Sequence, residues 1–440
     1  SRGGTMEAME PASDVVDPNN AGNPLEEDKN RHDGEERCRV IIRLKPLEKG
    51  EKEGRLRVEG EKIFVPGVNG TPSRRRKTDD DDGSAFQYDQ VFPTNSTQED
   101  VFLSVLQNSI SYVLEGFNAT VLAYGQTGAG KTYNMFGPPG ESLDDQDLRG
   151  LVPRALDEIF DRIDKDKSGS SFEVKLSMVE IYLEELIDLL KPNCNQKLRL
   201  RESVYQGVWV EGLSHFSVPT SRAALELVLG GMDNRTVGAT NMNDASSRSH
   251  CIVSLRVERA MPDGVVQCGV LHFADLAGME RVDRTGAQGQ TLEEAKRINL
   301  SLSALGNCIC ALSDPHRTHV PFRDAKLTFL LKNSLGGNAK TTLLVACSSR
   351  LKDADETVTA LRFGARARAV RNVVKVNQKL CAQELQRLLD KLQQEHRALQ
   401  QYCLALEQQI EDTISKDASS TPAASAPSGA GNASAGVQTS

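Results

Sequence analysis

The chain has 440 residues, of which 38% are hydrophobic and 26% are charged, and its 53 Lys and Arg against 61 Asp and Glu give a net charge of −8. This composition is ordinary for a globular protein. No stretch reaches the ~20 consecutive apolar residues of a membrane-spanning helix, and no strongly basic field suits nonspecific nucleic-acid binding. We therefore expect neither membrane insertion nor a nucleic-acid partner.

The first 36 residues differ in composition from the rest of the chain. They hold three basic and ten acidic side chains, so 3 − 10 = −7 of the net charge of −8 lies here. They lack an apolar repeat, and such a segment cannot bury enough apolar surface to become ordered. We predict a disordered acidic extension over residues 1–36, followed by a nearly neutral remainder.

Strand and helix patterns begin after this extension. Apolar runs, continuous or alternating, predict strands over residues 39–44, 120–124, 172–178, 251–257, 270–274 and 340–348. Apolar residues at steps of three and four from Ile298 to Leu312 predict an amphipathic helix. The mixture predicts an α/β fold in which helices cover both faces of a central sheet. No Pro/Gly/Ser-rich linker divides residues 38–370, so we expect one large domain.

The nine cysteines show no pattern of a metal site. The only close pair, Cys308 and Cys310, lacks the two-residue gap and the second pair that a zinc site has. This usage is typical of reduced, packed thiols and predicts a cytoplasmic protein.

The C-terminal part carries a heptad pattern. Leucine recurs every seven residues from Leu385 to Leu406, although the second apolar position of the heptads is half polar. The pattern predicts a coiled-coil neck over residues 381–414 and hence a homodimer, with a single long helix as the alternative. The Ser/Ala-rich residues 415–440 predict a flexible linker. We expect the chain to be a piece of a longer polypeptide, whose remaining part would bind cargo or light chains.

One segment has the spacing of a phosphate-binding loop. A buried strand precedes it and a helix can begin at Lys131, so backbone N–H groups would face the phosphates. Lys131 would reach the β- and γ-phosphates, and the Thr132 hydroxyl would bind Mg²⁺. The alternative, a glycine turn without a ligand, fits these flanks poorly. The segment comprises Gly125, Gln126, Thr127, Gly128, Ala129, Gly130, Lys131 and Thr132.

Two further segments could sense the γ-phosphate of a nucleotide. Residues 243–250, Asn-Asp-Ala-Ser-Ser-Arg-Ser-His, place hydroxyl groups around one arginine directly before a strand. Residues 275–280, Asp-Leu-Ala-Gly-Met-Glu, follow another strand and place an acidic group where Mg²⁺ would lie. Taken alone, each segment could be an ordinary polar turn.

In this order, each beside a strand, the three segments resemble those of the kinesin motor domain, and the resemblance covers about residues 38–377. Shorter matches begin at Phe86 (Phe-Gln-Tyr-Asp), Val179 (Val-Glu-Ile-Tyr), Asn299 (Asn-Leu-Ser-Leu-Ser), His319 (His-Val-Pro-Phe-Arg) and Asn333 (Asn-Ser-Leu-Gly-Gly). The resemblance implies a P-loop NTPase of the kinesin fold over residues 37–369, with a mixed central sheet. It also implies a microtubule-stimulated ATPase that uses ATP and Mg²⁺ to move on the microtubules of the cytoskeleton.

The resemblance assigns an adenine site beside the phosphate loop. Arg43, Pro46 and Tyr133 would hold the base, with Tyr133 stacking on it. Lys45 stands where the family usually has a second arginine, and its side chain lacks the planar guanidinium. We therefore expect a looser contact with the base.

Roles in phosphoryl transfer to water are carried over in the same way. Ser246 and Glu280 would position the attacking water and accept its proton. Arg248 would pair with Glu280 only when the γ-phosphate is bound, which would make the pair a switch. Asn243 and the Gly278 N–H would contact the γ-phosphate.

The metal site and one departure complete the assignment by resemblance. Thr132 and Ser247 would bind Mg²⁺ directly, whereas Asp275 would hold it through water. Met279 occupies a position where the family nearly always has serine. Because its neighbours match the family, we expect hydrolysis to persist at an altered rate.

The family's track is acidic tubulin, so a local basic surface is expected despite the nearly neutral total. Binding through such a surface weakens as salt rises. The residues that match the family's track-binding positions are Arg281, Arg284, Lys296, Arg323 and Lys326.

The order of the parts implies a direction of movement. Residues 370–380 follow the predicted motor directly and resemble the neck linker of conventional kinesin heavy chains, whose motors move toward the plus end. Their β-branched residues suit an extended strand docked on the motor. Three alternatives stay open, namely a GTPase, a non-motile microtubule-binding scaffold and a microtubule depolymerase. The GTPase is disfavoured because the chain has no Asn-Lys-x-Asp motif.

Overall fold

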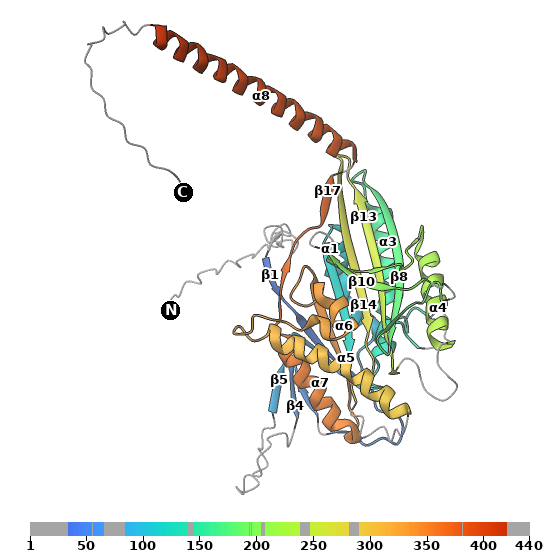
Figure 1. Ribbon diagram of the computed structural model, residues 1–440. Coiled ribbons are helices and arrows are strands. Elements are labelled where there is room, and N and C mark those ends of the chain that lie inside the picture. Colours follow the sequence, from blue (N-terminus) through green and yellow to red (C-terminus); the bar gives the residue numbers. More distant parts are fainter. Residues whose placement is uncertain are drawn as a thin grey trace, which may run out of the picture. The chain divides into compact units, whose positions relative to one another are not determined.

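The structure is a computed structural model that describes residues 34–54, 56–65, 84–138, 145–192, 194, 196–203, 207–237, 247–280, 290–380 and 382–419. The chain divides into two compact units, Ser1–Lys379 and Leu380–Ser440. The first unit contains a large sheet with helices on both faces (Figure 1).

The ten strands of the large sheet are β2 (Arg39–Lys45), β6 (Gln90–Phe92), β7 (Asn118–Tyr124), β8 (Ser171–Tyr182), β9 (Glu185–Asp188), β12 (Phe216–Ser217), β13 (His250–Ala260), β14 (Val265–Asp275), β15 (Lys340–Ser348) and β17 (Gln378–Leu380). The main path runs β12–β8–β13–β14–β7–β15–β2–β6, with β9 paired to β8 and β17 to β14. Pairing is parallel from β14 to β6 and antiparallel among β14, β13 and β8. The sheet is therefore mixed, as predicted.

Two apolar clusters pack the helices against the opposite faces of this sheet. One cluster includes side chains of α1 (Gln98–Leu114), α3 (Leu151–Lys165) and α4 (Ser221–Val237). The other includes side chains of α5 (Gln290–Leu312), α6 (Lys326–Leu330) and α7 (Ala354–Ala367). The predicted amphipathic helix is confirmed as α5, because Ile298, Leu302, Leu305 and Ile309 are all buried. Side chains alternate along a strand, so β2, β7, β8, β13, β14 and β15 each supply both clusters.

Smaller sheets lie outside the main one. A three-stranded sheet comprises β3 (Arg57–Glu59), β4 (Lys62–Val65) and β5 (Ser84–Gln87), and a hairpin comprises β10 (Arg199–Ser203) and β11 (Gly207–Glu211). A third pair joins β1 (Gly34–Arg37) to β16 (Arg371–Val374) in antiparallel register.

The pair β1–β16 corrects the predicted end of the disordered extension. Residues 34–36 were included in that extension, but they form a strand whose partner is more than 330 residues away in the sequence, since 371 − 37 = 334. Two ion pairs fix it, Glu36 with Lys340 at 2.7 Å and Arg37 with Asp89 at 2.7 Å. A distant partner supplies the order that the local composition lacks; residues 1–33 lie outside the described part.

Residues 370–379 lie extended along the first unit. Asn372 is buried, and its side-chain amide donates to the carbonyl oxygens of Ser334 and Ala339 while its oxygen accepts from the Gly336 N–H. Further on, the Asn377 amide donates to the Gly116 carbonyl oxygen at 3.0 Å. These bonds agree with the predicted docking of this segment as a strand.

The second unit contains the long helix α8 (Ala382–Ser419). The leucines at Leu385, Leu392, Leu399 and Leu406 are exposed, as a chain analysed without a partner would present them. The helix continues through residues 415–419, so the predicted linker begins later than expected. Propagation explains this extension, because adding one residue to a formed helix is far easier than nucleating one. None of the described helices is long and apolar enough to cross a membrane.

Candidate functional site

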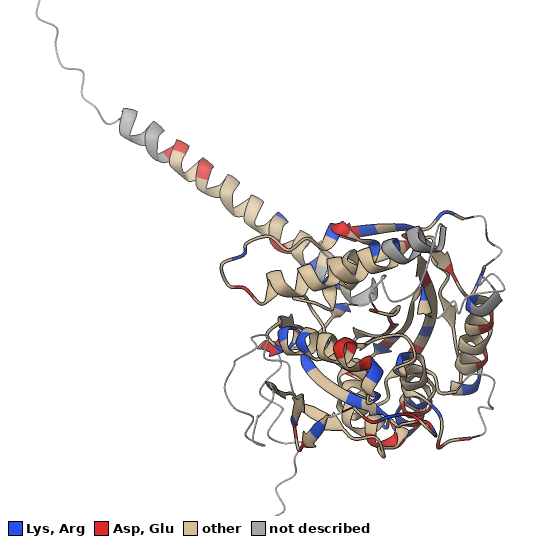
Figure 2. Cartoon of the chain, turned by 90° about the horizontal axis from the view of Figure 1, so that it is seen from below, with Lys and Arg blue, Asp and Glu red and all other residues tan. Residues whose placement is uncertain are grey.

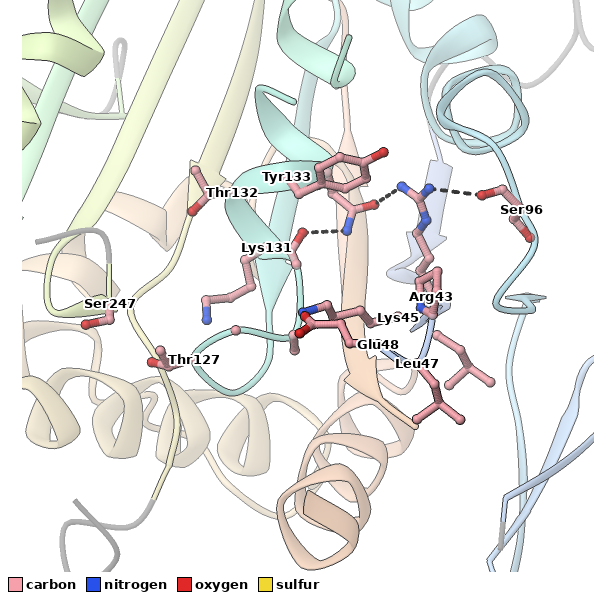
Figure 3. A pocket seen from close by; sticks show the side chains of 16 residues that line it. Arg43, Lys45, Leu47, Glu48, Ser96, Thr127, Lys131, Thr132, Tyr133 and Ser247 are labelled. Atoms are coloured by element: carbon pink, nitrogen blue, oxygen red, sulfur yellow. Dashed lines mark hydrogen bonds and ion pairs between the residues drawn. The ribbon is translucent and has the colours of Figure 1, made fainter. Parts of the chain in front are cut away.

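A pocket of about 520 Å³ opens at the edge of the sheet where β7, β15 and β2 end. Parallel strands place their carboxyl ends, and the loops that follow them, on one edge. Figure 3 shows Thr127, Lys131, Thr132 and Ser247 at one end of the pocket and Tyr133 and Arg43 at the other. The pocket is lined by Arg43, Leu44, Lys45, Pro46, Leu47, Glu48, Ser96, Thr127, Gly128, Ala129, Gly130, Lys131, Thr132, Tyr133, Asn134 and Ser247.

The predicted phosphate loop joins β7 to the short helix α2 (Lys131–Met135), which begins at the predicted residue. Gly125 has φ of 148°, and a Cβ atom there would lie 2.2 Å from the Ala346 carbonyl oxygen. Only glycine therefore allows the loop to leave the sheet here. The Lys131 ammonium is buried and donates to the carbonyl oxygens of Gly125 and Gln126, each at 2.9 Å. An anion at the loop would offer this cation a stronger partner.

The other end of the pocket suits a base. Tyr133 is 37% exposed, and the Arg43 guanidinium lies 5.6 Å from its ring centroid. Arg43 itself is buried and donates to the side-chain oxygens of Gln98 at 2.6 Å and Asn134 at 2.7 Å. Burial lowers the pKa of Arg43. Arg43 is thus held in place beside the Tyr133 ring. The part of the ring that is exposed to the pocket can stack on the base.

The residues of the predicted metal site fit a hard cation. The Thr132 hydroxyl donates to Asp275 Oδ2 at 2.8 Å, and Ser247 lines the same pocket. The second carboxylate oxygen, Asp275 Oδ1, is buried without a hydrogen-bond partner among the described residues. Mg²⁺ prefers oxygen ligands and keeps several waters, so a carboxylate beside two hydroxyls is a suitable donor set.

One buried residue of this site escapes the sequence analysis. Arg235, on α4, donates to Asp275 Oδ2 at 2.8 Å and to the Ser249 carbonyl oxygen at 3.0 Å, and its Nε lies 3.9 Å from Glu180. It is 2% exposed. A polar Asn-Arg-Thr stretch on a helix gives no sign of burial in the sequence. The pairing becomes visible only in the fold, where α4 packs against β8 and Arg235 reaches Asp275 at the end of β14.

Both predicted sensor segments meet at the phosphate loop. Glu280 accepts from the Thr127 hydroxyl at 2.6 Å and from the Thr127 N–H at 2.9 Å, while the Gly278 N–H donates to the Ser247 carbonyl oxygen at 3.0 Å. A Cβ atom at Gly278 would lie 2.1 Å from Thr127 Oγ1. The described arrangement therefore holds Glu280 on the phosphate loop, and its pairing with Arg248 stays a prediction.

Several predicted residues lie outside the described part of the chain. Asn243 and Ser246 belong to this group, as do Arg281 and Arg284 of the predicted track surface. Lys296 lies on α5, where the backbone alone is described.

The two described residues of the predicted track surface are both paired with acids. Arg323 lies 3.1 Å from Glu202 on β10, and Lys332 contacts the same carboxylate. Lys326 Nζ lies 3.5 Å from Glu185, which belongs to β9. Basic and acidic side chains are interspersed over this unit (Figure 2), so no single-sign field is evident.

Met279, the departure from the family pattern, is half-buried and packs against the apolar cluster beneath α5. The side chain thus adds apolar contact on the α5 side. Its neighbours Gly278 and Glu280 keep the contacts described above.

Comparison with known proteins agrees with this geometry. The kinesin motor domain family matches residues 43–370. Kinesin-related protein 5 of Dictyostelium discoideum is 48% identical over 327 residues, covering 74% of this chain and 33% of that protein. Kinesin heavy chain of Syncephalastrum racemosum is 45% identical over 326 residues, covering 74% and 34% respectively, so the chain spans about a third of either relative. A solved structure of a fast kinesin has a TM-score of 0.69 and 39% identity, covering 79% of this chain and 95% of that one.

Proposed function

This chain belongs to the kinesin motor-domain family, and on that premise we propose that it uses ATP and Mg²⁺ to move along microtubules toward their plus ends. Kinesin motor domains are microtubule-stimulated ATPases. The observation that carries the proposal is the meeting of the phosphate loop with both sensor segments, through the Thr127–Glu280 and Gly278–Ser247 hydrogen bonds. A γ-phosphate entering there would compete for the same N–H and hydroxyl groups.

The proposed chemistry starts from this competition. Phosphate bound at the loop takes the Thr127 donors, and Glu280 is released to pair with Arg248. Glu280 and Ser246 then position the attacking water, and Glu280 accepts its proton. Asn243 and the Gly278 N–H contact the γ-phosphate, and Lys131 stabilises the charge that develops on it.

Thr132, Ser247 and Asp275 are the residues proposed to hold Mg²⁺. When bound, the ion neutralises charge on the phosphate oxygens. Asp275 Oδ1, buried without a described partner, supports this assignment, because a water bound to the ion would satisfy it.

Track binding is proposed for Arg323, Lys326, Lys296, Arg281 and Arg284. The carboxylates Glu202 and Glu185, which pair with two of these residues, would have to release them to tubulin acids. Exposed pairs are weak, typically below ~1 kcal/mol, so such an exchange costs little. The proposed location is the cytoplasmic cytoskeleton, with dimerisation through α8.

Plus-end movement is supported by the extended residues 370–379, which leave the motor as a strand hydrogen-bonded at Asn372 and Asn377. Gliding of polarity-marked microtubules over the immobilised chain tests it. Movement with the minus end leading is expected. Movement with the plus end leading contradicts the proposed direction, and binding without movement favours the scaffold alternative.

The ATPase itself is tested by measuring hydrolysis with and without polymerised tubulin, in the wild type and in Glu280→Ala. Loss of a positioned base should lower the stimulated rate on the order of 100-fold. Glu226→Ala, on the exposed face of α4, is the matched control and should behave as wild type. Equal stimulation of all three proteins would contradict the role of Glu280, and end-dependent shortening of microtubules would favour the depolymerase.

A further inference from the structure

His250, the first residue of β13, lies between three segments that are far apart in the sequence. It is 3% exposed. Its Nδ1 accepts from the Ala277 N–H at 3.0 Å, and its Nε2 lies 2.8 Å from the Ser301 hydroxyl. Ala277 belongs to the loop that follows β14, and Ser301 belongs to α5. The imidazole of His250 therefore connects β13 with the predicted sensor segment 275–280 and with α5, the helix that carries Lys296 of the predicted track surface.

The contacts fix the donor and the acceptor of each hydrogen bond that links Ala277, His250, Ser301 and Ile298. Because Nδ1 accepts, the ring proton must be on Nε2, which donates to Ser301 Oγ. Ser301 then donates its own proton to the Ile298 carbonyl oxygen at 2.7 Å. Burial lowers the pKa of His250 to about 3, so the ring is neutral near pH 7. The result is a directed relay from the Ala277 amide to the backbone of α5.

The Ala277 end of the relay and His250 in its middle both lie beside the proposed chemistry. Ala277 directly precedes Gly278, whose N–H holds Ser247, and Ser249, next to His250, is the partner of Arg235. A second contact runs in parallel, since Asn299 of α5 donates to the Glu280 carbonyl oxygen at 3.3 Å. The second contact is long and half-buried, whereas the His250–Ser301 contact is short and buried. The imidazole is thus the stiffer of the two connections.

We propose that His250 is a positioning residue that, through Ser301, transmits a displacement of α5 to the Ala277–Glu280 loop and so couples microtubule binding to hydrolysis. The proposal rests on the proposed motor function. A buried histidine that merely satisfies its neighbours would affect folding and not the coupling. Basal and microtubule-stimulated hydrolysis separate these two roles.

The test compares Ser301→Ala with Ser303→Ala, an exposed serine on the same helix. In Ser301→Ala we expect a basal rate and KM for ATP close to wild type, and a microtubule-stimulated kcat lowered about tenfold, within the range of measured coupling effects. Ser303→Ala should be stimulated like wild type. Equal stimulation of both variants, or equal losses of basal and stimulated rates, would overturn the proposal.

A second variant tests the imidazole itself. His250→Asn keeps an acceptor near the position of Nδ1 but cannot reach Ser301. It should lower the microtubule-stimulated kcat as Ser301→Ala does. The double variant His250→Asn/Ser301→Ala should lower it no further than either single variant, because both changes remove the same His250–Ser301 hydrogen bond. Additive defects would show two separate effects and contradict a shared link.

A measurement independent of hydrolysis separates failure of this inference from failure of the motor function. Amide hydrogen exchange over residues 275–280 should change when wild-type protein binds microtubules, and this response should be lost in Ser301→Ala. If wild type is not stimulated by microtubules, the proposed function fails. If the exchange response is unchanged in Ser301→Ala, the inference fails whatever the hydrolysis rates are.

Discussion

At the scale of single residues, Asp275 is the point on which the site depends. One of its oxygens accepts from both Thr132 and Arg235, and the other has no hydrogen-bond partner among the described residues. Burial works against the charge of Arg235, but Asp275 and the neighbouring acceptors keep its pKa raised. Arg235 therefore stays cationic beside the Asp275 carboxyl group.

Replacing Arg235 tests this pair. Arg235→Gln leaves Asp275 buried with an uncompensated charge, and breaking a buried pair costs about 3–5 kcal/mol of unfolding free energy. Arg222→Gln, which removes an exposed partner of Glu226 from the same helix, should change that free energy by less than ~0.5 kcal/mol. Denaturant unfolding measures both variants. Similar losses in the two would contradict the buried role of Arg235.

A second residue-scale prediction concerns pH. Burial lowers the pKa of His272 from 6.5 to about 4, and its Nδ1 lies 2.8 Å from the Ser254 hydroxyl. The unfolded chain therefore binds more protons between these values, and stability falls as pH drops from 7 to 5, by about 2 kcal/mol from this histidine. His272→Gln should remove that part of the pH dependence of the unfolding free energy. His316→Gln, at an exposed site, should keep it, and identical pH profiles of wild type and His272→Gln would refute the assignment.

At the scale of elements, the sequence predicted the strands and helices whose residue pattern is local. The continuous apolar run of β15 and the three-and-four spacing of α5 are visible in the sequence, and so is the helix start at Lys131. The pairing of β1 with β16 is not, because Gly34–Arg37 is a polar, exposed stretch ordered by a remote partner. The burial of Arg235 could not be predicted for the same reason, because its partners are remote in the sequence. The proposed role of His250 likewise depends on its contact with α5, which the sequence does not reveal.

The docked strand β16 gives the element-scale prediction. The side chain of Asn372, which lies within β16, makes four hydrogen bonds, to Ser334, Gly336, Ala339 and Thr341. Asn372→Ala leaves buried carbonyl groups unsatisfied, so the strand should open more often. Amide exchange of residues 371–374 should become faster by about tenfold, the equivalent of ~1.4 kcal/mol. Asn108→Ala, exposed on α1, is the control, and unchanged exchange in Asn372→Ala would contradict the docking role.

At the scale of the whole molecule, the charge and the leucines define what the two units can do. The net negative charge lies almost entirely in the first 36 residues, whereas the remaining chain is nearly neutral, and its basic residues Arg323 and Lys326 are already paired with acids. Track binding through such pairs should weaken with salt. On α8, the exposed leucines are a surface that a second copy of the helix would cover.

Dimerisation is tested on that surface. Leu392→Lys/Leu399→Lys places two charges at the expected seam and should give monomers in sedimentation experiments, whereas the wild type is expected to sediment as a dimer. Replacing two exposed polar residues of the same helix, Gln393→Lys/Gln400→Lys, controls for added charge. A dimer that survives the leucine changes would show that the heptad register is wrong.

The strand order of the main sheet also dictates when the nucleotide pocket can exist during synthesis. β7, which leads into the phosphate loop, is flanked by β14 and β15, and these begin at residues 265 and 340. The ribosome adds about 5–20 residues per second, so β7 ends 340 − 124 = 216 residues before its second neighbour, a delay of about 10–40 s. Until β14 emerges, both edges of this apolar strand are unpaired, and one edge stays unpaired until β15 follows. Chaperone binding to this strand should therefore peak before β15 emerges, and nucleotide binding should be among the last properties that the new chain acquires.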